Sequence, residues 1–215
     1  MTMTVIVTII AAYLIGSINF AVIFAKAFMQ RDVRELGSGN AGATNVLRNA
    51  GFVPGVLTFV FDALKGFAAT YMGMAIFEYV NKKTGTDLSD AAIGALACGL
   101  ACMLGHVFPI FFEFKGGKGI AVSVGIFAVC APLAITIGVL IFTATVFITK
   151  YVSLGSVLAA VTVVVLSIIF CDKSAMLLPQ IVLILAMGAL VIIKHTENIK
   201  RLIAGTESKI KIGGK

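Results

Sequence analysis

The stretch IAVSVGIFAVCAPLAITIGVLIFTATVFITK, residues 120–150, decides how many times this chain crosses a membrane. Its apolar part, 120–148, is about 29 residues long, whereas one transmembrane helix needs only about 20. Pro132 lies near its middle, and proline breaks or kinks a helix because it has no backbone N–H and clashes with the preceding turn. Residues 120–148 are therefore either one long span or a hairpin of two short helices that turns near Pro132.

The composition of the whole chain is that of an integral membrane protein. Of its 215 residues, 60% are hydrophobic and 13% are charged, whereas soluble domains carry about 25% charged residues. Further apolar runs follow closely on one another and leave no room for a soluble domain, so we expect residues 1–215 to form a single all-α membrane-embedded domain. These runs are roughly 4–28, 52–77, 88–112, 154–171 and 176–193.

Three polar stretches interrupt the apolar chain, and their positive charge predicts its orientation. They are GSGNAGATNVLR (37–48), GHVFPIFFEFKGGKG (105–119) and KHTENIKRLIAGTE (194–207), called here the first, second and third polar stretch. Residues 26–48, the second stretch and the segment from 194 onward hold most of the chain's 17 lysines and arginines, and such residues favour the cytoplasmic side. All three can face the cytoplasm only if residues 120–148 cross twice. We therefore predict a bundle of about seven transmembrane helices, some of them short, with the N-terminus outside.

The first polar stretch has the composition of a phosphate-binding loop. Glycines free backbone N–H groups, hydroxyl and amide side chains add hydrogen bonds, and an arginine can hold a phosphate with two parallel bonds. The alternative is an ordinary loop followed by a capped helix. The residues that we expect to bind phosphate here are Ser38, Thr44, Asn45 and Arg48.

The second polar stretch ends in a glycine-rich segment at the start of the next apolar run. The partial positive charge of a helix N-terminus favours anions. Gly119 takes the place of the serine or threonine that would hold Mg²⁺ in a P-loop, so we expect no metal of that kind. His106 is expected to hold this loop in place rather than to catalyse. The predicted anion pocket consists of Lys115, Gly116, Gly117, Lys118 and Gly119.

The third polar stretch places His195 and Asn198 on one helix face, where they can orient a hydroxyl group or assist proton transfer. Glu207 is expected to cap the helix or to pair with Arg201 rather than to act as a catalytic carboxylate. Ser153 and Ser156, in YVSLGS (151–156), can donate hydrogen bonds to phosphate or satisfy the start of a helix.

Asp62 and Lys65 lie inside the second apolar run, where each alone costs about 2.5–3.5 kcal/mol. Their i, i+3 spacing allows them to pair. The pair is either a structural lock between helices or a wall of the polar site, with Lys65 the better placed to reach a substrate. Cys98 and Cys102 share a helical face with His106, but small apolar cysteines of a buried helix explain this spacing without a metal.

The three polar stretches in this order, with FDALKG (61–66) and YVSLGS, resemble the cytoplasmic motifs of the bacterial acyl-phosphate:glycerol-3-phosphate acyltransferases. The resemblance covers roughly residues 13–207. It implies transfer of a fatty acyl group from acyl phosphate to the 1-hydroxyl of glycerol 3-phosphate, which yields lysophosphatidic acid and inorganic phosphate in the first step of phospholipid synthesis. It further implies a multi-pass protein of the bacterial inner membrane that faces the cytoplasm and needs no cofactor. We expect a monomer whose partners are its two substrates and the lipid bilayer, with no nucleic acid.

By the family pattern, Ser38, Arg48, Lys118 and Ser153 hold phosphate, while His195 and Asn198 act at the transferring acyl group. Other glycerol-phosphate acyltransferases activate the hydroxyl with a His-x4-Asp pair, which is absent after both His106 and His195. We therefore expect direct attack on the acyl phosphate, with either His195 or a substrate phosphate oxygen as the proton acceptor. The alternatives are a membrane transporter of a phosphorylated solute, whose ligand would lie near the midplane, and a lipid-phosphate hydrolase. The sequence leaves the acyl-chain preference open.

Overall fold

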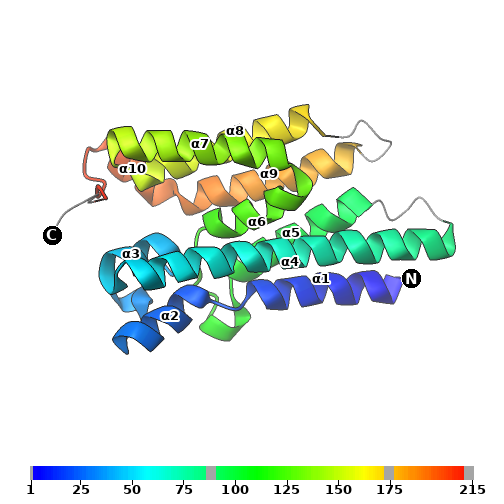
Figure 1. The fold of residues 1–215 in the computed structure, drawn as a ribbon, viewed down its shortest axis with the longest axis horizontal. Coiled ribbons are helices and arrows are strands. Elements are labelled where there is room, and N and C mark those ends of the chain that lie inside the picture. Colours follow the sequence, from blue (N-terminus) through cyan, green and yellow to red (C-terminus); the bar gives the residue numbers. More distant parts are fainter. Residues whose placement is uncertain (1, 86–90, 172–176, 211–215) are drawn as a thin grey trace.

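The computed structural model describes residues 2–85, 91–171 and 177–210, and all regular secondary structure within these ranges is helical (Figure 1). The beginnings of two predicted spans, at 88–90 and 176, lie outside the described residues, as do Lys173, Lys211 and Lys215. The elements are α1 (Thr2–Gly16), α2 (Phe20–Met29), η1 (Val33–Glu35), α3 (Ala43–Ala50), α4 (Phe52–Thr84), α5 (Ala91–Val107), η2 (Ile110–Phe112), α6 (Ile120–Cys130), α7 (Pro132–Thr149), α8 (Val152–Ile169), α9 (Leu177–Lys194) and α10 (Thr196–Ile203).

Residues 120–148 form two helices, as the position of Pro132 predicts. α6 ends at Cys130 after 11 residues, and α7 begins at Pro132 and continues for 18 residues. Proline is well suited to the first position of a helix because its missing N–H would have no partner there. Figure 1 shows α7 running back along the outside of the bundle beside α8, while α6 lies between α4 and α9.

Within the described residues, six helical segments are long and apolar enough to cross a membrane, and α6 is a shorter apolar helix. Together they account for the seven predicted helices. The first segment is not continuous, because α1 ends at Gly16 and the Asn19 side chain accepts a hydrogen bond from Val22 N to start α2 (3.2 Å). α4 extends past the predicted end at 77 to Thr84, and Gly85 then ends it in the left-handed conformation.

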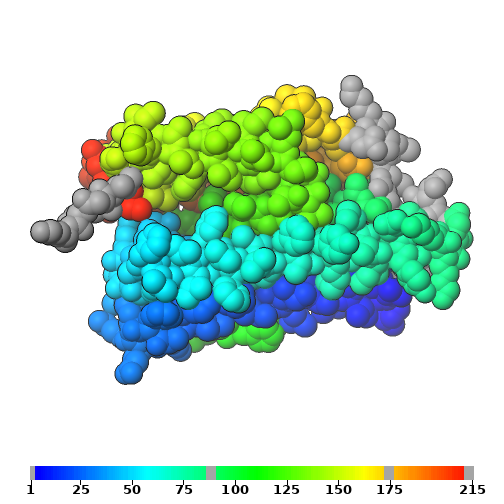
Figure 2. All heavy atoms as spheres, in the orientation of Figure 1, coloured from blue at the N-terminus to red at the C-terminus, as the bar shows by residue number. Residues whose placement is uncertain are grey.

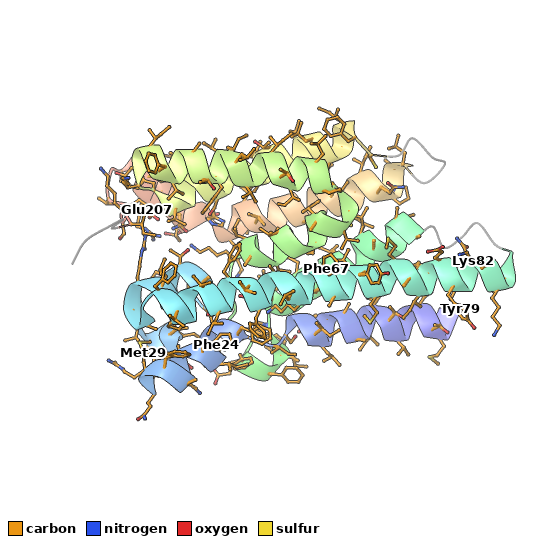
Figure 3. The ribbon with its side chains drawn as sticks, viewed as in Figure 1. Phe24, Met29, Phe67, Tyr79, Lys82 and Glu207 are labelled. Atoms are coloured by element: carbon orange, nitrogen blue, oxygen red, sulfur yellow. The ribbon has the colours of Figure 1, made fainter. Side chains whose placement is uncertain are left out.

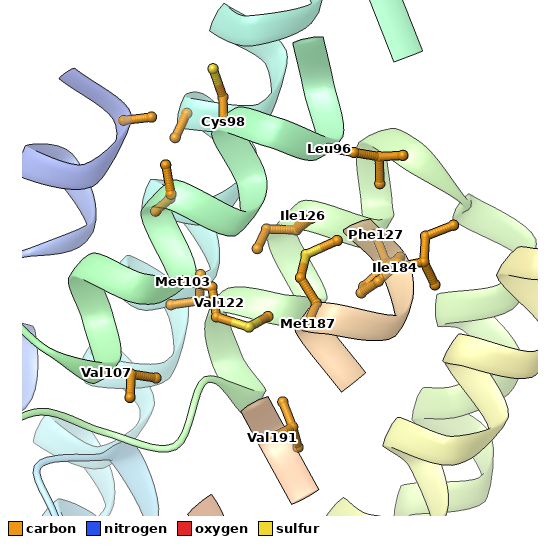
Figure 4. Packing of buried hydrophobic residues seen from close by; sticks show 14 of the residues in the cluster. Leu96, Cys98, Met103, Val107, Val122, Ile126, Phe127, Ile184, Met187 and Val191 are labelled. Carbon is orange, nitrogen blue, oxygen red and sulfur yellow. The ribbon is translucent and has the colours of Figure 1, made fainter. Parts of the chain in front are cut away.

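The bundle is held together by an apolar core around α6. Its buried members include Met103, Ile126, Phe127 and Met187, contributed by α5, α6 and α9 (Figure 4). On the other side of α6, glycines at 66 and 125 allow α4 and α6 to approach closely, because a Cβ at either position would collide with backbone of the other helix. Such small-residue contacts are typical of membrane helices, whose association gains little from the hydrophobic effect.

The polar stretches lie toward one end of the bundle. α3 and α10 lie at this end, and the start of α1 lies at the other (Figure 1). Figure 3 shows Glu207 at the end that carries α3, far from Tyr79 and Lys82. The first and third polar stretches therefore share one end of the molecule. This arrangement is required if all polar stretches are to face the same side of the membrane.

Candidate active site

A polar cavity of about 1220 Å³ joins the three polar stretches at the α3 and α10 end of the molecule. Figure 2 shows this end hollowed between α7 (yellow-green) and the α3–α4 region (cyan). The cavity is also bordered by the N-terminal ends of α6 and α8. The expected residues that line it are Ser38, Thr44, Asn45, Arg48, Asp62, His106, Lys118, Gly119, Ser153, Ser156, His195, Asn198 and Glu207.

Asn45 organises the first polar stretch instead of offering its side chain to a ligand. Its Nδ2 donates to the carbonyl oxygens of Val33, Leu36 and Asn40 at 2.9–3.0 Å, and its Oδ1 accepts from Ser38 N (3.2 Å). These bonds occupy the carboxamide, so our expectation that Asn45 donates to phosphate is replaced by a structural role. The same bonds hold Ser38 and the start of α3, with Thr44, against the cavity.

Lys118 and Gly119 place a positive charge where α6 begins. Gly119 has φ +88°, a conformation that favours glycine, and the chain turns there into α6. Burial is the main cause that lowers the pKa of Lys118, and the positive charge of the nearby Arg201 adds to it, so that this pKa is about 8. A cation held at such an energetic cost is stabilised when an anion binds beside it.

A chain of polar contacts connects the second and third polar stretches. Lys118 Nζ donates a hydrogen bond to Asn198 Oδ1. Asn198 Nδ2 donates to Glu207 Oε1 (2.7 Å), and Arg201 Nε donates to Glu207 Oε2 (2.6 Å). Burial raises the pKa of Glu207, but the bonds from Asn198 and Arg201 outweigh it and lower that pKa overall. The predicted pairing of Glu207 with Arg201 is thus found.

His195 is buried at the cavity wall with one ring nitrogen engaged. Its Nδ1 lies 2.8 Å from Val191 O, and because a carbonyl only accepts, Nδ1 must carry the proton of the neutral ring. Burial lowers the pKa of His195, so the ring is neutral at pH 7. Nε2 is then an acceptor, suited to a substrate hydroxyl.

The two serines at the start of α8 take different roles. Ser156 Oγ donates to Val152 O within its own helix (2.9 Å). Ser153 lies in the first turn of α8, where backbone N–H groups lack partners within the helix, and it lines the cavity. Ser153 is therefore the better placed of the two for an anion.

Asp62, Lys65 and His106 form a buried cluster beneath the cavity. Asp62 Oδ1 lies 2.8 Å from Lys65 Nζ and 3.5 Å from His106 Nδ1. Lys65 Nζ also donates to Ile18 O at the break between α1 and α2 (2.6 Å). Asp62 and His106 line the cavity, whereas Lys65, which we expected to be the better placed to reach a substrate, lies outside the lining and is bonded to Asp62 and Ile18.

Three residues of the predicted anion pocket lie outside the cavity lining. Lys115 is exposed and pairs with Glu113 at 3.3 Å. Gly117 N donates to His106 O (3.1 Å), and a Cβ at Gly116 or Gly117 would collide with His106. These glycines pack the loop against the end of α5, so His106 holds the loop as expected, through its backbone carbonyl.

The sequence patterns did not indicate that the C-terminal segment borders the cavity. Ser208, Lys209 and Ile210 line it. Arg48 Nη2 donates to Ser208 O (3.0 Å), and Ile210 N donates to Lys150 O (2.8 Å). The segment therefore ties α3 to the connection between α7 and α8, and its only signal in the sequence is the basic Lys209.

A second, apolar cavity of about 260 Å³ continues from the polar one into the bundle. Phe59, Ile120 and Phe142 line both cavities. Its walls come from α6, α7, α8 and α9, with Phe59 of α4, and it lacks charged side chains among its lining residues. A molecule with a charged head and an apolar tail fits this combination.

The chain matches known proteins along nearly its whole length. A family model described as glycerol-3-phosphate acyltransferase matches residues 6–205. "Glycerol-3-phosphate acyltransferase 2" of Bacillus anthracis is 40% identical over 205 residues, which cover 95% of this chain and 98% of the relative. The enzyme of Thermoanaerobacter sp. (strain X514) is 43% identical over 205 residues, which cover 95% of each chain.

The fold also matches solved structures. The crystal structure of PlsY (YgiH), an integral membrane glycerol 3-phosphate acyltransferase, in its glycerol 3-phosphate form has a TM-score of 0.81 and 35% identity over 96% of each chain. Its lysophosphatidic acid form has a TM-score of 0.79 and 34% identity, and covers 96% of this chain and 95% of that one. With the family model and the relatives in agreement over nearly every helix, this chain belongs to the glycerol-3-phosphate acyltransferase family.

Proposed function

We propose that the chain transfers a fatty acyl group from acyl phosphate to the 1-hydroxyl of glycerol 3-phosphate and releases lysophosphatidic acid and inorganic phosphate. It acts as a single-domain monomer in the bacterial inner membrane, with the polar cavity open to the cytoplasm. The observation that carries the proposal is a polar cavity rich in unneutralised cations that continues into an apolar one.

The charge of the polar cavity supports two phosphate groups. Its lining carries two carboxylates, and both have partners: Asp62 pairs with Lys65, and Glu207 with Arg201. Lys118 contacts the neutral carboxamide of Asn198, and Arg48 contacts a backbone carbonyl, so neither charge is cancelled. Phosphates of the acceptor and of the leaving group would meet this excess of positive charge.

We assign the phosphate contacts to the two sides of the cavity. Ser38, Thr44 and Arg48 lie together on the α3 side and would hold one phosphate. Lys118, Gly119 and Ser153 lie at the starts of α6 and α8 and would hold the other. Each group combines a hydroxyl or backbone N–H donors with a cation, as phosphate sites require.

The reaction needs no covalent intermediate on the protein. The 1-hydroxyl oxygen attacks the acyl carbon, a new C–O bond forms, and the bond from the acyl carbon to the phosphate oxygen breaks, so phosphate leaves with the electron pair. His195 accepts a hydrogen bond from the hydroxyl through Nε2 and orients it, while Lys118 and Asn198 lie beside the leaving phosphate. The proton passes to a substrate phosphate oxygen, whose pKa is near 6, while burial lowers the pKa of His195 and makes the imidazole a weaker base.

The test is an assay of phosphate release by purified protein supplied with palmitoyl phosphate and glycerol 3-phosphate. We expect release only when both substrates are present, together with lysophosphatidic acid in equal amount. Release without the acceptor would indicate a hydrolase, and absence of release with both substrates would refute the proposal.

A further inference from the structure

The apolar cavity extends away from the polar cavity along four helices at once. On α6 it is lined by Ile120, then Ser123 and Val124, then Phe127. The step from Ile120 to Phe127 spans seven residues, which corresponds to about 10 Å along a helix. On α8 the order is the same: Ser156 lines the polar cavity, and Ala160 and Val163 line the apolar one at increasing depth.

The antiparallel helices α7 and α9 repeat this order in reverse. Phe142 lines both cavities, and Ile135 lies seven residues further from the polar end of α7. On α9, His195 lines the polar cavity, while Val191 and then Met187 line the apolar one. These four helices, with Phe59 of α4, therefore line one channel that leads inward from the reacting groups.

The hydroxyl groups of the channel wall are bonded within their own helices. Ser123 Oγ donates to Gly119 O and Thr143 Oγ1 donates to Val139 O, each at 2.8 Å within its own helix. Hydroxyls bonded in this way leave the rest of the wall apolar, and apolar walls favour hydrocarbon over water. The occupant that this chemistry fits is the alkyl chain of the acyl donor.

The channel ends against packed core. Phe127, Ile135, Val163 and Met187, called here the channel floor, line its inner end and belong to or pack on the buried cluster that continues to Leu96 and Ile184. Figure 4 shows Phe127 and Met187 beside Ile184 in this cluster. Phe127 is only 3% exposed, so the floor is solid packing rather than an opening.

From this geometry we infer that the channel floor sets the acyl-chain length that the enzyme accepts, with Phe127 as its main determinant. The inference rests on the proposed function, because it takes the acyl phosphate as the molecule whose tail enters the channel. A chain that reaches the floor gains buried surface with each methylene, about fourfold in binding per methylene. A longer chain must bend out of the channel and loses that gain.

Substitutions at two positions change the channel in opposite directions. Phe127→Ala removes the floor and makes the channel deeper, and Phe127→Leu does so more gently should the alanine variant fail to fold. Ala160→Leu fills the channel one turn below Ser156 and makes it shallower. Phe147→Ala is the matched control, because Phe147 lies on α7, outside the cavity lining, and is 69% exposed.

The experiment measures kcat/KM for saturated acyl phosphates from octanoyl to stearoyl phosphate and divides each value by that of the unchanged enzyme. For Phe127→Ala the ratio should rise with chain length, about fourfold for each methylene newly accommodated. For Ala160→Leu it should fall with length and be least affected with octanoyl phosphate, while Phe147→Ala gives a flat ratio. Flat ratios for the Phe127 and Ala160 variants would overturn the inference while the unchanged enzyme is still active. An unchanged enzyme that releases no phosphate with any chain would refute the proposed function and, with it, this inference.

Discussion

Two groups of charged side chains border the polar cavity, and they differ in how their charges are neutralised. In the first, Asp62 and Lys65 pair at 2.8 Å with side chains at most 3% exposed, and Lys65 also reaches the carbonyl of Ile18. In the second, Glu207 is held by Asn198 and Arg201, and the Lys118 ammonium donates to the neutral oxygen of Asn198. The first group is closed on itself and joins helices, whereas the second keeps unneutralised positive charge beside a cavity.

This difference separates structural from ligand-binding charges, and burial follows it: the Asp62–Lys65 pair is closed off from solvent, whereas Arg201 is 43% exposed. Both groups stand out in the sequence as charges beside or within apolar runs. Only the second offers a site to an external anion, since its cations exceed its carboxylates. Substitutions that remove one member from each group therefore test the comparison directly.

The largest effect on stability is expected for Asp62→Ala. It leaves the Lys65 charge unpaired in the bundle, which costs about 3–5 kcal/mol for a broken buried pair, and should lower the unfolding midpoint in detergent markedly. Glu78→Ala is the control: it breaks the exposed Lys82–Glu78 pair (2.7 Å) and should leave the midpoint unchanged.

A double substitution separates the lost pair from other damage at this position. Asp62→Leu combined with Lys65→Met removes both charges and should recover most of the stability lost by Asp62→Ala, because apolar replacement of a buried pair is often neutral. Equal losses for the single and double variants would show that the pair does not act as a structural lock.

A smaller effect, on catalysis rather than stability, is expected for the second group, which contains Lys118. Lys118→Met removes a cation from the side of the cavity that we propose holds the leaving phosphate, and we expect kcat/KM to fall about 10²–10³-fold, the range for loss of one transition-state donor. Lys115→Met, three residues away and outside the cavity lining, should leave kcat/KM within about twofold of the unchanged enzyme. Similar losses at both positions would mean that general loop charge, not the cavity, matters.

His195→Ala should reduce activity less than Lys118→Met does. If His195 orients the hydroxyl and a substrate phosphate takes the proton, the loss is that of one hydrogen bond to a group that becomes charged, about 10–10²-fold in kcat. Thr196→Ala, at an exposed neighbour that bonds only Ile193 O, should have no effect. A loss beyond about 10⁴-fold, the upper range for general base catalysis, would make His195 the base.

Much of this fold could be predicted from local sequence, because its causes are local. Pro132 marks the turn between α6 and α7, and the i, i+3 spacing of Asp62 and Lys65 gives their pairing. The break between α1 and α2 also has a local cause, the capping Asn19, but a continuous apolar run hides it.

The site was less predictable because its contacts are long-range. Asn45 has the residue type of a phosphate ligand, yet three carbonyls of its own loop occupy its amide. Lys65 turns to Ile18, 47 residues earlier, and Arg48 meets Ser208, 160 residues later. Composition identifies groups that can bind phosphate, but only the packing of distant helices decides which of them are left free to do so.

The smallest effect expected is a dependence of substrate affinity on pH, and it arises from Lys118. An amine is charged below its pKa, and burial lowers the pKa of Lys118 to about 8, so the unliganded site loses this charge as the pH rises from 7 to 9. The substrate phosphates have a pKa near 6 and change little in this range. The KM of the substrate whose phosphate contacts Lys118 should therefore rise about tenfold between pH 7 and 9. Lys118→Arg, whose side chain stays charged, should show no such rise, and a rise of equal size in that variant would assign the titration to another group.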